Sequence, residues 1–275
     1  MYGGGNAFKI RQQRFNTKDV REVSLEMSSS EKIIGRWLEK NKCRTAMMLM
    51  SKVSSGNSPQ NIRTQMTASL ENLQTDHLDV YQIHRPDPAA PIDKSLEALT
   101  ELTEAGYANS IGCSNISKMQ LKQALEASDL HGLARFEYVQ LPYNLVQRKE
   151  LMELNAICQR EKVRILAYSP LAAGFLTGKY KPGGTIPGSS RFDISPTHQE
   201  IYFNTKNFEV VQKLSRFAEE LGITMPRLAV AWALSNPGVT STLIGARKVE
   251  HIETALEALR LKNNFSIFHQ MNKWF

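Results

Sequence analysis

From about residue 31 onward, the chain alternates between two patterns of apolar and polar residues. Short runs of apolar or β-branched residues indicate buried strands, and longer segments with apolar residues three and four positions apart indicate helices. The short runs predict six strands, at about 45–51, 78–83, 108–113, 136–140, 163–168 and 239–243. The longer segments predict helices at about 30–40, 58–73, 92–104, 117–128, 148–161, 208–221, 226–235 and 249–259.

This alternation of strands and helices indicates parallel βαβ units. A doubly wound sheet and a (β/α)8 TIM barrel are both built from such units, so the pattern alone leaves two α/β architectures open. No Gly-x-Gly-x-x-Gly follows the first predicted strand, and this absence weakens the doubly wound, dinucleotide-binding alternative.

Three segments fall outside the alternation. Residues 6–29 are polar and basic, and we interpret them as an insertion or an exposed arm. Residues 172–205 are polar with several Gly and Pro, and a loop of that length in a compact domain is usually functional or mobile. The C-terminal tail carries several aromatic residues that either line a pocket or pack on the domain, and we favour packing. These aromatic residues are Phe265, Phe268, Trp274 and Phe275.

The composition is that of a globular protein: of 275 residues, 41% are hydrophobic and 22% are charged. This length predicts a single domain over 1–275. No apolar run reaches the roughly 20 residues that a membrane helix needs, and the N-terminus does not resemble a signal peptide. The cysteines at 43, 113 and 158 are widely spaced, so we expect neither disulfides nor a metal site. We expect the protein to belong to a reducing, cytoplasmic compartment.

The net charge of +7 has two interpretations. One is solubility, and the other is attraction of an anionic ligand such as a phosphorylated cofactor. The basic residues are scattered, apart from a short run at 9–21, and no nucleic-acid-binding motif is present. We therefore expect no nucleic-acid partner.

Polar residues stand at the C-terminal end of each predicted strand, which is where barrel enzymes gather their active-site groups. They are, in chain order, Lys52, His84, Ser114, Asn115, Gln140, Tyr168, Ser169, Gly245 and Arg247. Each one alone has an ordinary explanation, such as a surface charge or a helix cap. Their occurrence at one strand end after another favours a common site.

Ordered motifs around these residues resemble those of the aldo-keto reductase family. They are the segments 2–5 with 30–35, 51–53, 79–87, 111–115, 139–144, 167–171 and 244–247. The resemblance covers about residues 30–260, and it is to the bacterial and fungal branches akin to potassium-channel β-subunits and deoxysugar ketoreductases. It implies a (β/α)8 barrel in which NADPH reduces a small-molecule carbonyl substrate, an aldehyde or a ketone, to an alcohol.

The resemblance implies a catalytic role for three residues. Tyr2 would be the general acid that protonates the carbonyl oxygen, although a free tyrosine titrates near pH 10. Lys52 would favour the phenolate by its charge and so lower the pKa of Tyr2. His84 would donate a hydrogen bond to the same carbonyl oxygen.

The resemblance also implies how the cofactor is held. Ser114, Asn115 and Gln140 would bind the nicotinamide carboxamide. Tyr168 would stack under the nicotinamide ring, the alternative being an aromatic residue at the rim of the barrel. The pyrophosphate would lie along 169–176.

The residues of that pyrophosphate segment are Ser169, Leu171, Gly174 and Leu176, and Gly174 would let the backbone approach closely. Arg247 would pair with the adenosine 2′-phosphate, which favours NADPH over NADH. Lys248 would assist Arg247, and Gly245 would also belong to the cofactor site. His251 stands where the family often has glutamine, so the adenine contacts are expected to differ.

The family places a catalytic aspartate and two further strands before Tyr2, and the chain as written begins one residue before Tyr2. Two hypotheses follow. The first is a working reductase. The second is a catalytically impaired protein that binds NADPH or a partner, such as a homo-oligomer that covers open strand edges.

Overall fold

The computed structural model describes residues 29–54 and 56–275, and it contains one parallel sheet of six strands in the order β1-β2-β3-β4-β5-β6. The strands are β1 (Met50–Val53), β2 (Leu78–Ile83), β3 (Ala108–Ser114), β4 (Phe136–Pro142), β5 (Arg164–Tyr168) and β6 (Val239–Thr242). A doubly wound sheet reverses its strand order, whereas a barrel adds each strand beside the previous one. The fold is therefore α/β and consistent with an incomplete (β/α)8 barrel.

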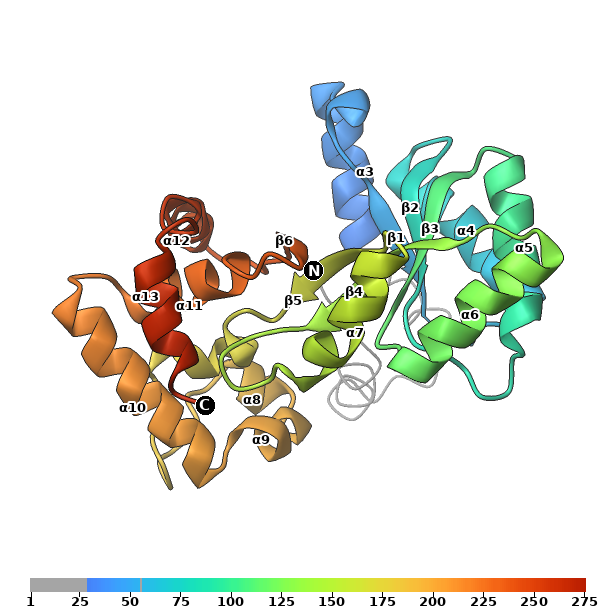
Figure 1. Ribbon diagram of the computed structural model, residues 1–275. Helices are drawn as coiled ribbons and strands as arrows, with labels where there is room; N and C mark the ends of the chain where they lie inside the picture. The colour runs from blue at the N-terminus through green and yellow to red at the C-terminus, as the bar shows by residue number, and fades with distance from the viewer. Residues whose placement is uncertain (1–28, 55) are drawn as a thin grey trace. The chain divides into compact units, whose positions relative to one another are not determined.

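Helices follow the strands in the predicted alternation (Figure 1). The longer ones are α3 (Ser29–Asn41), α4 (Pro59–Leu73), α5 (Ile92–Glu104), α6 (Lys118–His131), α7 (Lys149–Arg160), α10 (Thr205–Glu220), α11 (Met225–Leu234), α12 (Val249–Leu259) and α13 (Phe265–Asn272). The short ones are η1 (Arg44–Ala46), η2 (Ala172–Thr177), α8 (Arg191–Ile194) and α9 (Thr197–Tyr202).

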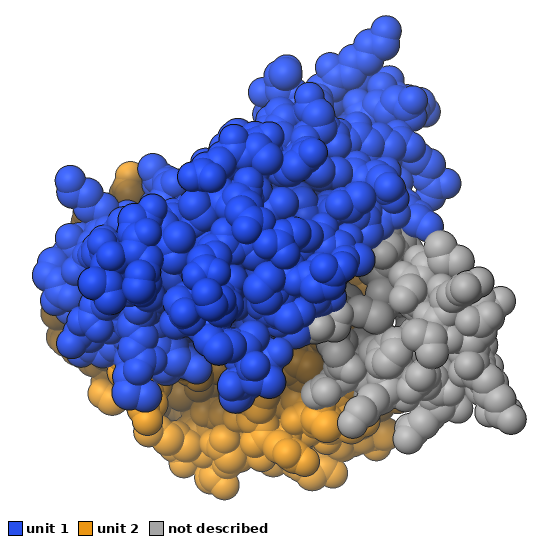
Figure 2. Space-filling model, turned by 90° about the vertical axis from the view of Figure 1, so that its right-hand side faces the viewer, with its two compact units in different colours: residues 1–140, 156–164 blue, residues 141–155, 165–275 orange. Residues whose placement is uncertain are grey.

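The chain divides into two compact units, shown in different colours in Figure 2. Unit 1 comprises residues 1–140 and 156–164, and unit 2 comprises residues 141–155 and 165–275. The expectation of a single domain remains a prediction. Tyr2 and residues 6–28 of the predicted arm at 6–29 lie outside the described residues, and Ser29, the last residue of that arm, begins helix α3.

Local capping signals in the sequence determine where the helices of unit 1 begin and end. Ser58 caps α4 by accepting a hydrogen bond from the backbone N–H of Asn61. Ser117 and Gln120 form a reciprocal capping box at the start of α6. Gly106 follows α5 with a φ of 79°, a left-handed conformation that glycine adopts without strain. The starts of α4 and α6 and the end of α5 match the sequence predictions, whereas α6 ends at His131, about three residues later than predicted.

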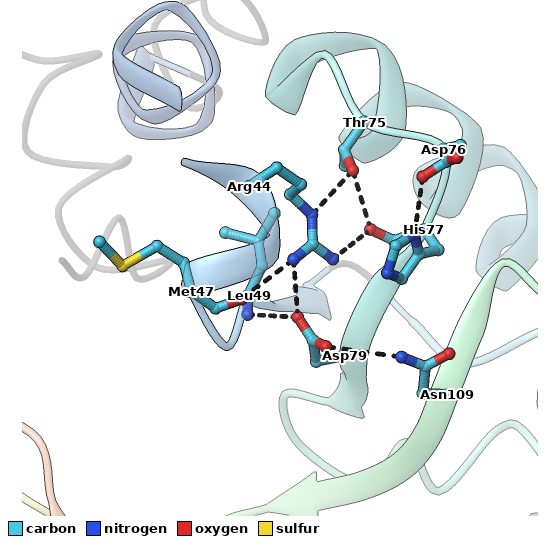
Figure 3. Close-up of polar contacts among 8 residues, drawn as sticks. All are labelled: Arg44, Met47, Leu49, Thr75, Asp76, His77, Asp79 and Asn109. Carbon is cyan, nitrogen blue, oxygen red and sulfur yellow. Dashed lines mark hydrogen bonds and ion pairs between the residues drawn. The ribbon is translucent and has the colours of Figure 1, made fainter. Parts of the chain in front are cut away.

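The first strand begins later than predicted, at Met50 instead of residue 45. The reason is the side chain of Arg44, which lies at the centre of a polar network (Figure 3). Its guanidinium donates to the Thr75 hydroxyl at 2.9 Å and to two backbone carbonyls, and it pairs with Asp79 at 3.0 Å. These contacts favour a 3-10 turn at 44–46, and they leave Met48 exposed to solvent.

Helix α3 is joined to β1 and α4 by the carboxylate of Glu31. The hydroxyls of Ser51 and Ser69 donate to this carboxylate at 2.5 and 2.8 Å, and the amide of Asn72 donates at 3.2 Å. Gly35 lets the two helices approach closely, because a Cβ atom there would lie 2.4 Å from the backbone oxygen of Asn72.

We expect the substitution Gly35→Ala to destabilise the protein by about 2 kcal/mol, because the clash is with backbone that cannot rotate away. The measurement is the urea unfolding midpoint. Gly188→Ala is the control for replacing a glycine that has no close neighbour, since a Cβ there meets nothing within 4 Å and its backbone is not left-handed. A Gly35→Ala midpoint equal to that of the native protein would contradict the close packing of α3 on α4.

The segment 172–205 of unit 2 is not a structureless loop, contrary to the expectation from its polar composition. It forms η2, α8 and α9, and its aromatic side chains pack against one another. The rings in this cluster are Phe175, Tyr180, Phe192, Tyr202 and Phe203 of the segment and Phe208 of α10, with centroid separations between 4.8 and 6.1 Å. Burial of these large rings supplies the core that the apolar periodicity of the segment does not reveal.

The C-terminal tail packs against the rest of unit 2, and packing was the interpretation that the sequence favoured. Phe268 is buried in α13, and the ring of Trp274 lies edge-on against Phe217 at 5.7 Å. Arg148 lies over the ring of Phe275 at 3.4 Å. Phe265 is exposed to solvent, and Phe275 remains partly exposed beside Arg148.

Candidate active site

The C-terminal ends of β1 to β4 bring the predicted polar residues of unit 1 together. The backbone N–H of His84 donates to Val53 at the end of β1. The side-chain amide of Asn115 donates to the carbonyl of His84 at 2.9 Å and to the Ser114 hydroxyl at 3.1 Å. Ser114 in turn donates to the carbonyl of Gln140 at 3.0 Å. Hydrogen bonds thus connect the ends of β2, β3 and β4, and they fix the positions of the Ser114 and Asn115 side chains.

Electrostatics couples Lys52 and His84. Burial lowers the pKa of Lys52 from 10.5 to about 8, because a desolvated ammonium is disfavoured. Burial also lowers the pKa of His84, and the nearby charges of Lys52 and Arg85 lower it further. Near neutral pH this edge of the sheet therefore carries a protonated lysine beside a neutral imidazole, which is able to donate a hydrogen bond from one ring nitrogen.

In unit 2, Tyr168 ends β5 and Ser169 follows it, and hydrogen bonds from other residues hold the backbone of both in place. Ser169 has a φ of 56°, which is unusual for a residue other than glycine. The buried side chain of Asn144 donates to the carbonyl of Ser169 at 3.0 Å, and the N–H of Tyr143 donates to the carbonyl of Tyr168. Asn144 was part of a sequence motif, but the sequence did not reveal this role.

The chain after Leu171 turns through three successive left-handed residues, Ala172, Ala173 and Gly174, with φ values of 49°, 58° and 93°. Such a conformation costs free energy at alanine and is most often found at functional sites. The ammonium of Lys179 lies 3.5 Å from the position of a Cβ on Gly174, and it adds positive charge beside the turn. Leu176 is 0% exposed, backbone included, so no part of this residue lies on the surface.

The segment from Gly245 to His251 is exposed to solvent at the start of α12. The guanidinium of Arg247 donates to the carbonyl of Ser189 at 3.0 Å, and its backbone N–H donates to the His251 ring at 3.4 Å. Lys248 is the N-cap residue of α12. Two cations at a helix N-terminus form an arrangement that attracts an anion.

Gln82 is a site residue that the sequence did not single out. Its side chain is fully buried beside Lys52 in the sheet, and neither of its amide atoms has a hydrogen-bond partner within the described residues. A surface hollow of about 850 Å³ lies elsewhere in unit 1, along α4 and α5, and contains none of the predicted site residues. Among residues 29–54 and 56–275, no cluster of three metal-ligating side chains occurs.

The comparisons with known proteins agree with this arrangement. The model of the family described as "Aldo/keto reductase family" matches residues 23–272. The chain belongs to this family. Aldo/keto reductases are oxidoreductases that generally use NAD(P)H, so a general oxidoreductase role follows. Within the described part of the chain, no helix has the length and apolar character needed to cross a membrane.

Three relatives illustrate the range of proteins to which this chain is similar. The protein tas of Escherichia coli (strain K12) is 32% identical over 263 residues, which span 85% of this chain and 75% of the relative. The aldo-keto reductase yakc of Schizosaccharomyces pombe, named for NADP(+), is 30% identical over 246 residues, spanning 85% of this chain and 71% of the relative. A probable voltage-gated potassium channel subunit beta of Arabidopsis thaliana is 34% identical over 200 residues, spanning 70% of this chain and 59% of the relative.

Proposed function

We propose that this aldo/keto reductase reduces an aldehyde or a ketone to an alcohol with NADPH. The observation that carries the proposal is that Lys52 and His84 stand at the ends of two adjacent strands, where burial lowers the pKa of both side chains and the charge of Lys52 lowers that of His84 further. Clustered groups with shifted pKa values of this kind are typical of acid–base sites.

The cofactor fits the residues present. Three side chains of unit 1, Ser114, Asn115 and Gln140, offer amide and hydroxyl groups suited to a carboxamide. In unit 2, the left-handed turn at 172–174 presents backbone of the kind that accommodates phosphate, and Arg247 lies exposed near the start of α12. NADPH, when bound, supplies a hydride to the carbonyl carbon.

The proposed catalytic roles belong to the residues of unit 1 together with Tyr2. His84, neutral at pH 7, donates a hydrogen bond to the carbonyl oxygen and stabilises the negative charge that develops there. Tyr2 gives a proton to the same oxygen, and the ammonium of Lys52 lowers the pKa of its phenol. Tyr168 supports the nicotinamide ring, and Ser169, Leu171 and Gly174 line the pyrophosphate.

Arg247 is proposed to select NADPH over NADH through the 2′-phosphate, with Lys248, Gly245 and His251 beside it. Arg247→Ala should raise the dissociation constant for NADPH by about 30-fold, the loss expected for a charge-assisted contact to phosphate. The dissociation constant for NADH should change less than about twofold, because NADH lacks that phosphate. Quenching of tryptophan fluorescence measures both constants. Equal weakening of the two cofactors would refute the 2′-phosphate role.

The proposed reaction is tested by two measurements on the full chain. Saturable quenching of tryptophan fluorescence by NADPH tests binding, and the loss of nicotinamide absorbance with a panel of aldehydes and ketones tests turnover. Turnover that falls in Tyr2→Phe supports the proposal. Binding without turnover of any carbonyl would instead favour the second hypothesis, an NADPH-binding or interaction protein.

A further inference from the structure

Gln82 occupies a position where a buried amide is costly. Its side chain is 0% exposed, and neither its oxygen nor its nitrogen has a hydrogen-bond partner among the described residues. Buried polar groups are almost always hydrogen-bonded, and those that are not call for a specific explanation, such as a bound water or a catalytic role. Residues that break such a rule tend to lie at functional sites.

Gln82 and Lys52 project to the same face of the sheet. The preceding residues, Ser51 and Tyr81, face the helices, because Ser51 bonds to Glu31 of α3 and the Tyr81 hydroxyl donates to Ile62 of α4. Successive side chains along a strand alternate between faces, so Lys52 and Gln82 both point to the face opposite the helices.

The sheet register makes Lys52 the direct neighbour of Gln82 on one side. On the other side the register partner is Gly112, which has no side chain. A Cβ at Gly112 would lie 3.3 Å from Cγ of Gln82 and 2.6 Å from the carbonyl oxygen of Tyr138. Glycine therefore leaves room for the amide between two strands, and the functional group nearest to it in the register is the ammonium of Lys52.

We infer that Gln82 is a positioning residue for Lys52, and that its amide oxygen accepts a hydrogen bond from one buried water to which the ammonium of Lys52 also donates. This inference rests on the proposed function, in which Lys52 works as an ammonium. A bridge through water fits because adjacent strands lie roughly 4.8 Å apart, and yet no direct hydrogen bond joins the two side chains. A neutral acceptor stabilises the ammonium without adding charge to the site.

Few other charged groups lie where they would stabilise the ammonium of Lys52 in place of Gln82. On the described elements in contact with β1, the titratable residues are Glu31, Lys32, Arg36, Glu39 and Lys40 of α3, Arg63 and Glu71 of α4, Asp79 and Tyr81 of β2, and His84 and Arg85 just after β2. Glu31 and Tyr81 lie on the helix-facing side, and Asp79 is held by Arg44 at the opposite end of β2. At the Lys52 end, Arg85 is a cation that offers no acceptor, and His84 is a neutral imidazole near pH 7, so neither adds negative charge beside the ammonium.

The test compares Gln82→Met and Gln82→Glu with the native protein. Methionine keeps the length of the side chain but accepts no strong hydrogen bond, so the pKa of Lys52 should fall by about half a unit or more. Glutamate adds a negative charge, so that pKa should rise. The pKa is read directly by NMR titration of labelled lysine, which does not depend on turnover. In activity assays, the alkaline loss of kcat should move in the same directions, and kcat of Gln82→Met should fall about tenfold with a smaller change in KM.

Two further variants keep the outcome interpretable. Thr242→Val on β6 removes another buried polar atom without a partner among the described residues, and it should leave the pKa of Lys52 unchanged. The urea midpoint of Gln82→Met should not fall, because the amide that it removes has no described protein partner. An unchanged Lys52 pKa in both Gln82 variants would overturn the inference, and so would a lower midpoint without a pKa change. If Lys52→Met keeps native turnover, the proposed function fails, whereas the NMR titration still decides the role of Gln82.

Discussion

Lys52→Met is expected to lower kcat/KM for carbonyl reduction by about 10³-fold while leaving the protein folded. Methionine has a similar length but no charge, so the phenol of the general acid keeps a pKa too high for efficient proton transfer at neutral pH. The dissociation constant for NADPH should stay within about twofold of the native value, because none of the groups proposed to hold the cofactor is removed. Steady-state kinetics and fluorescence titration of the same sample provide both quantities.

The pH dependence gives the Lys52 prediction a second readout. The working form is the ammonium, and burial lowers the pKa of Lys52 to about 8. Activity should therefore be present below pH 8 and lost as the pH rises above it. Lys149→Met removes an exposed lysine, 85% accessible, and should change neither the rate nor the alkaline limb. Native turnover in Lys52→Met would refute the proposed role of the lysine.

Arg44→Met is expected to destabilise the protein by about 3 kcal/mol at pH 7, because it leaves a largely buried carboxylate and two carbonyls without their charged partner. The Arg44 and Asp79 side chains are 20% and 23% exposed, so solvent screens this pair only in part. The network in Figure 3 joins the turn before β1 to the start of β2. Arg63→Met is the matched control, because the Arg63–Glu101 pair is exposed and should contribute less than about 1 kcal/mol.

The effect of Arg44→Met should also depend on pH. Burial by itself would raise the pKa of Asp79, but the hydrogen bond from the N–H of Leu49 and the charge of Arg44 together lower it below 3.8. The ionised carboxylate thus contributes stability above pH 3.8, and this contribution is lost as the pH falls through the folded-state pKa. Urea unfolding at pH 7 and pH 3 should show a smaller difference between native and variant protein at the lower pH. A constant difference would contradict the ion pair.

Much of the fold was predictable because local signals and the global fold agree. The strand at 78–83 and the helices that follow Ser58 and Ser117 occur where the periodicity and the caps placed them. Capping and periodicity are local interactions, so they can be recognised without knowing the tertiary contacts. The polar residues at the strand ends were recognisable for the same reason, since parallel strands present their C-terminal ends at one edge.

The segments that the sequence assigned wrongly are those whose structure depends on contacts between residues that are distant in the chain. The run at 45–51 is apolar, but Arg44 reaches residues about 30 positions away in the chain and holds part of it in a turn. The segment 172–205 is polar on average, but a few aromatic residues spread along it form a shared core. Neither effect leaves a periodic pattern in the chain.

The sequence by itself determined the order and type of most elements, the family and the residues at the strand ends. Only the tertiary structure decided which of these residues touch, that Glu31 links α3 to β1 and α4, and that Gln82 is buried beside Lys52 without a described partner. The physical reason is that burial and desolvation depend on which strands become neighbours. A glutamine within a strand pattern has the same appearance in the sequence whether it faces solvent or a buried lysine.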